Sequence, residues 1–191
     1  MNMNIHLFQL IHAGAGNHPL VDSVAIFFAE GGPYLLALLF VVLWFFVGNH
    51  KKTILVEATE AAIIGLIVNQ LIGFFYFHPR PYMLGICTPL FPHRPETSFP
   101  SDHATLLFAA TCYLLISRRW PVCAISLLAV TLLTAWGRVY CGIHFPFDMV
   151  GSLVVGLASA GVTSRFSSHL RPLNAALLQI CNQLKGMLTS R

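Results

Sequence analysis

The sequence predicts an all-α integral membrane protein with about five transmembrane helices, built as a single domain over residues 1–191. Hydrophobic residues make up 56% of the chain and charged residues only 9%, whereas soluble domains carry roughly 25% charged residues. The charged residues lie singly or in pairs between apolar runs. A nucleic-acid-binding protein would gather them into a patch or stripe, so we expect no nucleic-acid partner despite the net charge of +4.

The spans are predicted from apolar runs, since a helical crossing takes about 20 residues. Two shorter stretches come first, Asn4–His12 and Pro19–Glu30. We expect residues 1–33 to lie at the membrane interface, or to continue into the first span through a kink at Pro33. No basic residue precedes Lys51, which disfavours a cleaved signal peptide. The five predicted spans are Tyr34–Val47, Ile54–Phe77, Asp102–Ile116, Val122–Val139 and Phe147–Thr163.

The C-terminal segment, residues 170–191, is predicted to be an amphipathic helix on the membrane surface, following a bundle at residues 34–167. Basic residues Arg171, Lys185 and Arg191 accompany its apolar face. A partner-binding helix is the alternative. The apolar residues recur with helical spacing at Leu173, Leu177, Ile180, Leu184 and Met187.

The basic residues predict the orientation. If the spans alternate, eight of the 11 fall on one side, which the positive-inside bias identifies as cytoplasmic, together with the C-terminus. Arg80, Arg94 and Arg138 fall on the outer side, so we expect a functional site there. Cys87 and Cys141 lie near the same face and are candidates for a disulfide. The eight are Lys51, Lys52, Arg118, Arg119, Arg165, Arg171, Lys185 and Arg191.

The outer face also gathers the residue types that hold and transfer phosphate. Ser101 is the predicted N-cap of the helix that begins at Asp102, and a helix N-terminus offers free N–H groups and a positive dipole end to an anion. His103 follows in the first turn. Pro146 places His144 just outside the last span, with Asp148 in its first turn. The carboxylate can then hold one imidazole nitrogen and leave the other free as a nucleophile.

A zinc site is the main alternative for these residues, because His103, His144 and Asp148 are all possible ligands. Arg80 and Arg138 would repel a cation, whereas they suit an anion. We therefore predict a phosphate site that uses no metal and no other cofactor.

Three segments resemble the signature of the type 2 phosphatidic acid phosphatase superfamily, written KxxxxxxRP, PSGH and SRxxxxxHxxxD. They are Arg80-Pro81, then Pro100-Ser101-Asp102-His103, then Arg138 with His144 and Asp148. Within that superfamily, the Phe-Pro-Ser-Asp-His and His-Pro-Arg-Pro-Tyr stretches resemble the bacterial undecaprenyl-diphosphate phosphatases of the bacitracin-resistance type. The similarity covers about Gly73 to Asp148.

This resemblance implies a mechanism and a location. His144 attacks the terminal phosphorus and becomes phosphohistidine, Asp148 orients it, and His103 protonates the departing oxygen. Arg80, Arg138 and Ser101 hold the phosphate. The implied substrate is undecaprenyl diphosphate, a polyprenyl diphosphate lipid, cleaved on the outer face of the bacterial inner membrane to the monophosphate used in cell-wall synthesis. Because His103 must be protonated to act as an acid and His144 must be neutral to act as the nucleophile, an optimum near or below neutral pH is expected.

The sequence departs from the signature at three positions, which carry Gly73 for the lysine, Asp102 for the glycine and Gly137 for the serine. We expect Arg94 or His78 to replace the missing phosphate cation. Asp102 joins the phosphate site by position, but its charge should repel the substrate. Its side chain is therefore expected to turn away, toward a loop arginine.

Other functions stay open at this point. The lipid substrate could instead be phosphatidic acid or phosphatidylglycerophosphate. A non-catalytic protein that binds or transports lipid phosphates would need the arginines but not the pair of His144 and Asp148. The oligomeric state is left open.

Overall fold

The computed structural model describes residues 3–189, with the side chains of His50, Asn182 and residues 184–189 left aside. The secondary structure of this part of the chain consists of helices joined by loops, and it contains no strand. The all-α fold predicted from the sequence is confirmed. The elements are α1 (Met3–His12), α2 (Pro19–Phe46), α3 (Asn49–Phe75), the 3₁₀-helix η1 (Pro81–Leu84), α4 (Asp102–Ser117), α5 (Pro121–Tyr140) and α6 (Pro146–Thr189).

Four of the described helices are long and apolar enough to cross a membrane: α2, α3 from Lys51, α5, and α6 as far as Cys181. The fifth predicted span corresponds to α4, which has 16 residues. At about 1.5 Å per residue it is shorter than a hydrocarbon core of about 30 Å. The predicted multi-pass bundle is therefore present, as four long helices and one short one.

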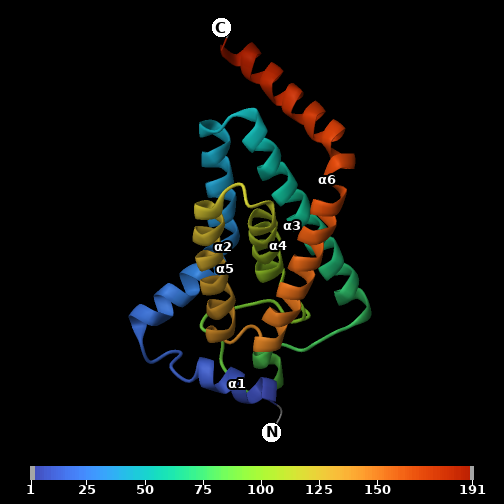
Figure 1. The fold of residues 1–191 in the computed structure, drawn as a ribbon. Coiled ribbons are helices and arrows are strands. Elements are labelled where there is room, and N and C mark those ends of the chain that lie inside the picture. Colours follow the sequence, from blue (N-terminus) through green and yellow to red (C-terminus); the bar gives the residue numbers. More distant parts are fainter. Residues whose placement is uncertain (1–2, 190–191) are drawn as a thin grey trace.

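Helix α4 forms the centre of the bundle, where it packs against α3, α5 and α6 (Figure 1). Nearly every residue between Ala104 and Leu114 is buried. Helix α6 approaches it closely at Gly156, where a Cβ atom would lie 2.8 Å from the backbone nitrogen of Ala109. Small residues permit such contacts between membrane helices. The central position of α4 fixes its N-terminus, and with it Ser101 and His103, inside one end of the bundle.

The two ends of the bundle differ. Helix α1, η1 and the loop of residues 76–101 cover one end, while the turn between α2 and α3 and the C-terminal part of α6 lie at the other (Figure 1). Arg80, Arg94 and Arg138 belong to the first end. The described basic residues predicted to be cytoplasmic fall at or toward the second; Arg191 lies outside the described residues, as does the side chain of Lys185.

Pro19–Glu30 does not form a separate interfacial helix. It is continuous with the first predicted span in α2, and Pro33 lies inside that helix. This corrects the boundary that the sequence suggested at residue 33 and favours the continuous alternative. A proline inside a helix has no N–H to give to the carbonyl four residues earlier, which here is that of Ala29. That carbonyl accepts from a side chain in the site described below.

The predicted C-terminal helix is not separate either, because α6 runs without a break through Pro172 to Thr189. Three members of its predicted apolar face, Leu173, Leu177 and Ile180, are exposed on the described surface. The side chains of Leu184 and Met187 lie outside the described residues. Contact of this face with the membrane surface stays a prediction.

The candidate disulfide is absent, since Cys87 and Cys141 are both free thiols. Cys87 directs its Sγ toward the carbonyl oxygen of Gly142, 3.5 Å away. Cys141 is fully buried and packs with Ala25, Ala29 and other side chains of a different cluster. The two residues contribute to separate apolar clusters of the bundle.

Candidate active site

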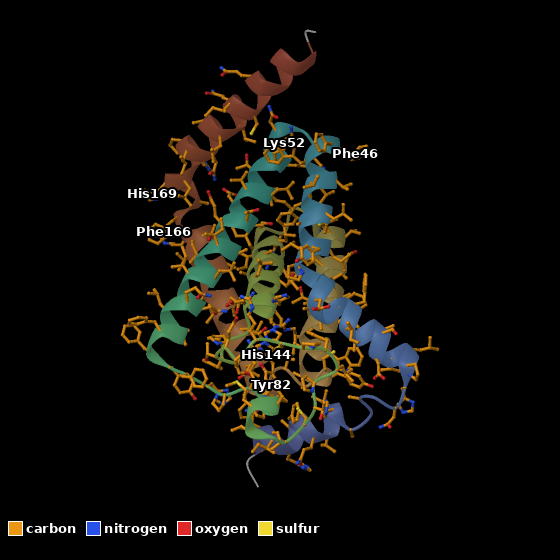
Figure 2. All side chains as sticks on the ribbon, turned by 180° about the vertical axis from the view of Figure 1, so that it is seen from behind. Phe46, Lys52, Tyr82, His144, Phe166 and His169 are labelled. Carbon is orange, nitrogen blue, oxygen red and sulfur yellow. The ribbon has the colours of Figure 1, made fainter. Side chains whose placement is uncertain are left out.

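His144 lies in the turn between α5 and α6, at the end of the bundle that α1 and η1 cover. Figure 2 shows it near Tyr82 and far from Lys52 and Phe46, which mark the opposite end. The turn follows Gly142, whose φ of +83° is a conformation that glycine adopts without strain. The imidazole is 1% exposed. The chain reversal after α5 therefore carries this side chain into the protein interior.

The contacts of the His144 ring define its tautomer. Nδ1 lies 2.8 Å from the carbonyl oxygen of Ser98, which can only accept, so Nδ1 carries the hydrogen. Nε2 lies 3.0 Å from Nη1 of Arg80 and 3.1 Å from Nη2 of Arg138, and it keeps its lone pair. Burial lowers the pKa of His144 to about 3, and the two guanidinium groups act in the same direction. A neutral imidazole thus presents its unprotonated nitrogen where an anion would be held.

Asp148 supports His144 from the first turn of α6. Its Oδ2 lies 3.4 Å from Nδ1 of His144 and accepts a 2.8 Å bond from the N–H of Phe145. It also accepts a hydrogen bond from the hydroxyl of Ser98. The other oxygen, Oδ1, lies 3.4 Å from Nδ1 of His78. Sequence reasoning placed Asp148 correctly beside His144 but gave Ser98 no role.

Arg80 is held by the backbone. Its Nε donates to the carbonyl of Glu96 at 3.2 Å, Nη1 to that of Ile143 at 2.9 Å and Nη2 to that of Thr97 at 3.1 Å. The residue is 4% exposed, and this burial lowers the pKa of Arg80. Three carbonyl acceptors at the edges of one guanidinium fix its plane beside His144.

Arg138 takes the carbonyl that Pro33 leaves free in α2. Its Nη1 donates to the oxygen of Ala29 at 3.2 Å, while Nη2 faces His144. Gly137 makes this approach possible, because a Cβ atom there would lie only 2.6 Å from the carbonyl oxygen of Ala25. Gly137, which stands where the family signature has a serine, is the point of contact between α2 and α5. Helix α2 therefore supplies an acceptor to the site, which the sequence did not indicate.

Ser101 caps α4 as predicted. Its Oγ accepts from the N–H of Ala104 at 3.5 Å, and its own N–H donates to Oγ of Ser152 at 2.9 Å. Asp102 turns away from the arginines, as expected, but toward α3: its carboxylate accepts from Nδ2 of Asn69 at 2.9 Å and from Nε2 of Gln70 at 3.2 Å. The expected partner, a loop arginine, is wrong, because two amide donors on α3 lie nearer to the start of α4.

The remaining candidates divide between the site and the surface. His103 lines a cavity with Arg138 and with His93, a residue to which the sequence assigned no function. His78 faces Asp148, and Arg94 is exposed. The replacement of the missing lysine by either residue stays a prediction. The structure brings His144, Asp148, Arg80 and Arg138 together and places Ser101 and His103 at the adjoining end of α4. Asp102 is directed toward α3.

Comparison with known proteins identifies the family of the chain. The model of the PAP2 superfamily matches residues 54–172, which is more than half of the chain and includes every residue of the site except the contacts from α2. The chain belongs to the PAP2 superfamily. Its family membership, inferred above from three short segments, is thereby confirmed.

Individual relatives extend the similarity to most of the chain. Undecaprenyl-diphosphatase BcrC of Bacillus subtilis (strain 168) is 33% identical over 192 residues, covering 99% of this chain and 97% of the relative. The putative undecaprenyl-diphosphatase YbjG of Escherichia coli (strain K12) is 36% identical over 157 residues, covering 82% and 78%. The crystal structure of LpxE from Aquifex aeolicus superposes with a TM-score of 0.72 at 26% identity, covering 86% of this chain and 96% of that one.

Proposed function

We propose that this protein is a membrane lipid phosphatase that hydrolyses undecaprenyl diphosphate to undecaprenyl phosphate and inorganic phosphate. The observation that carries the proposal is the buried neutral His144, whose Nε2 lone pair lies between two guanidinium groups. That arrangement suits attack on a phosphorus atom whose oxygens are held by arginine. The choice of lipid rests on the similarity to the undecaprenyl-diphosphatases over nearly the full chain.

In the first step, the terminal phosphoryl group enters between Arg80 and Arg138. Nε2 of His144 forms a bond to phosphorus as the bond from phosphorus to the bridging oxygen breaks. The ring becomes positively charged, and Asp148 with the Ser98 carbonyl stabilises it through Nδ1–H. His103 supplies the proton to the departing oxygen, so that the lipid leaves as its monophosphate.

In the second step, water attacks the phosphorus of phosphohistidine. His103, left neutral by the first step, accepts the proton of the water, and the bond between Nε2 and phosphorus breaks. Arg80 and Arg138 stabilise the equatorial oxygens while negative charge moves across them in both steps. The guanidinium groups supply the charge neutralisation, and phosphate then leaves.

The proposed orientation places the site on the outer face of the bacterial cytoplasmic membrane and the C-terminus in the cytoplasm. It is supported by the separation of basic residues between the two ends of the bundle, with Lys51, Lys52, Arg118 and Arg119 at the end opposite His144. Accessibility of cysteines introduced at Arg94 and Arg119 to an impermeant maleimide in intact cells tests this. Labelling at residue 119 alone would show that the protein has the opposite orientation in the membrane.

The activity is tested with purified protein in detergent. Phosphate release is compared from undecaprenyl diphosphate, phosphatidic acid and phosphatidylglycerophosphate, each with EDTA present. We expect the diphosphate to be the best substrate, and His144→Ala to abolish both turnover and an acid-labile phosphoenzyme. His103→Ala should slow formation and breakdown of that intermediate.

Three results would contradict the proposal. If the protein released phosphate from none of the lipids, the non-catalytic alternative would remain. A protein that only binds lipid phosphates, however, does not need the hydrogen-bonded set of Ser98, His144 and Asp148. Preference for a monophosphate lipid would favour the other phosphatase classes. Inhibition by EDTA with recovery on adding zinc would refute the phosphohistidine mechanism.

A further inference from the structure

A cavity of about 280 Å³ adjoins Arg138 and has no assigned function in the mechanism above. Arg138 lines this cavity and also contacts His144. A water molecule takes up about 30 Å³ of liquid volume, so the cavity has room for a group much larger than one water. Its lining is mostly polar or aromatic: Glu30, Tyr34, Phe91, His93, His103 and Arg138.

The position of His103 indicates which part of a substrate enters this cavity. In the proposed mechanism His103 protonates the departing oxygen, so the leaving group lies on the side of Arg138 where His103 lies. For a diphosphate ester the leaving group is itself a phosphate, still joined to its lipid. Arg80, Arg138 and Ser101 serve the phosphoryl group that is transferred. The retained phosphate needs donors of its own.

His93 is placed to be such a donor. Its Nδ1 lies 3.1 Å from the carbonyl oxygen of Arg94, which can only accept, so Nδ1 carries the hydrogen. Its Nε2 lies 3.4 Å from Nη2 of Arg138. The same nitrogen of Arg138 contacts His144 at 3.1 Å, so one guanidinium lies between two imidazoles.

The loop that carries His93 is itself fastened. The hydroxyl of Tyr82 in η1 contacts the carbonyl oxygen of His93 at 3.2 Å and that of Arg94 at 2.6 Å. The backbone on the C-terminal side of His93 is therefore held by η1, the element that follows Arg80. A fixed backbone lowers the entropy lost when the imidazole engages a ligand.

We propose that this cavity is the subsite for the retained phosphate of a diphosphate substrate and that His93 is the side chain that binds it. The proposal rests on the function proposed above and deepens it. His93 would then make the enzyme discriminate between diphosphate and monophosphate esters, because only a diphosphate ester places a phosphate in the cavity.

Binding involves proton uptake by His93. Burial and the positive charges of Arg80 and Arg138 lower the pKa of His93 in the free protein, while the hydrogen bond to the Arg94 carbonyl and the charge of Glu96 oppose them. A diphosphate brings negative charge that favours a proton on Nε2, which then donates to a phosphate oxygen. His103 from α4 also faces the cavity.

Glu30 gives the cavity an opposing charge. Its exposed carboxylate on α2 lies in the lining and repels a phosphate, most of all the doubly charged monophosphate product. Glu30→Gln should accordingly tighten inhibition by the product, and unchanged inhibition would contradict this placement of the retained phosphate.

The test uses one lipid chain with either one or two phosphates, geranylgeranyl monophosphate and geranylgeranyl diphosphate, and the full-length purified protein. His93→Ala should lower kcat/KM for the diphosphate by about 10- to 100-fold, the range for a lost hydrogen bond to a charged group, and for the monophosphate by less than about threefold. His93→Gln retains a donor and should recover part of the loss. His6→Ala, an exposed histidine on α1, is the matched control.

Equal losses on the two lipids would overturn the proposal, since His93 would then act only through Arg138. A second measurement is independent of turnover: protection against thermal unfolding by methylenediphosphonate and by orthophosphate. His93→Ala should weaken protection by the diphosphonate alone, and unchanged protection would also overturn the subsite. If wild-type protein hydrolyses no lipid phosphate, the proposed function fails while this measurement still decides the subsite.

Discussion

Ser98 donates its hydroxyl hydrogen to Oδ2 of Asp148 from a position in which its own carbonyl oxygen accepts from His144. One serine therefore holds both the nucleophilic histidine and the carboxylate that orients it. Ser98 is fully buried, so its hydroxyl cannot be replaced by bulk water without rearrangement.

Ser98→Ala should lower kcat by about 10- to 100-fold with little change in KM, which is the usual loss for a residue that orients a reacting ligand or base. The carbonyl contact survives, so the protein should still form phosphohistidine, more slowly. Rapid-quench measurement of phosphoenzyme formation checks this. Ser168→Ala on the exposed part of α6 serves as the control, and a KM effect without a kcat effect would contradict an orienting role.

The buried neutral state of His144 predicts how stability varies with pH. Folding lowers the pKa of His144 from 6.5 to about 3, so between these values the unfolded chain binds a proton that the folded protein does not. Stability is then full above pH 6.5 and falls as pH decreases toward 3. The apparent Tm in detergent should follow this curve.

A variant that cannot titrate, His144→Asn, should show a flatter decrease of Tm between pH 6.5 and 4. His93, whose pKa is also lowered by burial, contributes in the same direction and remains in that variant. His6→Asn should retain the wild-type slope. An identical slope for wild type and His144→Asn would show that His144 is not neutralised by burial.

The two loop arginines should respond differently to substitution. Arg80→Lys removes two of three donor positions that meet the carbonyls of Glu96, Ile143 and Thr97, of which the contact with Ile143 is buried and the other two are partly buried. We expect a loss of kcat/KM of about 100-fold or more. Arg94→Ala, at an exposed side chain, should cost less than about threefold. Comparable losses would restore Arg94 as the substitute for the missing lysine.

Pro33→Ala should change stability and activity in opposite directions. Alanine restores the N–H that can bond the Ala29 carbonyl, which favours helix α2 but competes with Nη1 of Arg138. We expect a higher Tm and a several-fold lower kcat/KM. Pro172→Ala in α6 is the matched control, with the stability gain alone. A Pro33→Ala protein with unchanged activity would show that Arg138 does not depend on this carbonyl.

Sequence patterns predicted the parts of the site that are governed by local rules. Pro146 and the helix that it starts place Asp148 beside His144, and Ser101 precedes a helix that it caps. These relationships span only a few residues and follow from helix geometry. Charge patterning likewise separated Arg80, Arg94 and Arg138 from the other basic residues before any fold was known.

The relationships that escaped prediction all join distant segments. A serine in a loop has no pattern that marks it as a partner of a carboxylate 50 residues later, as Ser98 is for Asp148. Asp102 was expected to pair with a loop arginine, but the orientation of α3 places the amide donors of Asn69 and Gln70 within hydrogen-bond distance of its carboxylate. Pro33 was recognised as a local kink, whereas its effect on Arg138 depends on which helix crosses α2.

The glycine at position 137 has a structural consequence that the family signature does not indicate. With no side chain at this position, the backbone of α2 comes within 3 Å of where a Cβ would lie. A serine there and the present crossing of α2 exclude each other, so a chain with the serine must satisfy its arginine through a different acceptor. The residue before the arginine therefore acts as a spacer that decides whether a helix outside the signature takes part in the chemistry. Gly137, Pro33 and Ala29 should consequently vary together among relatives.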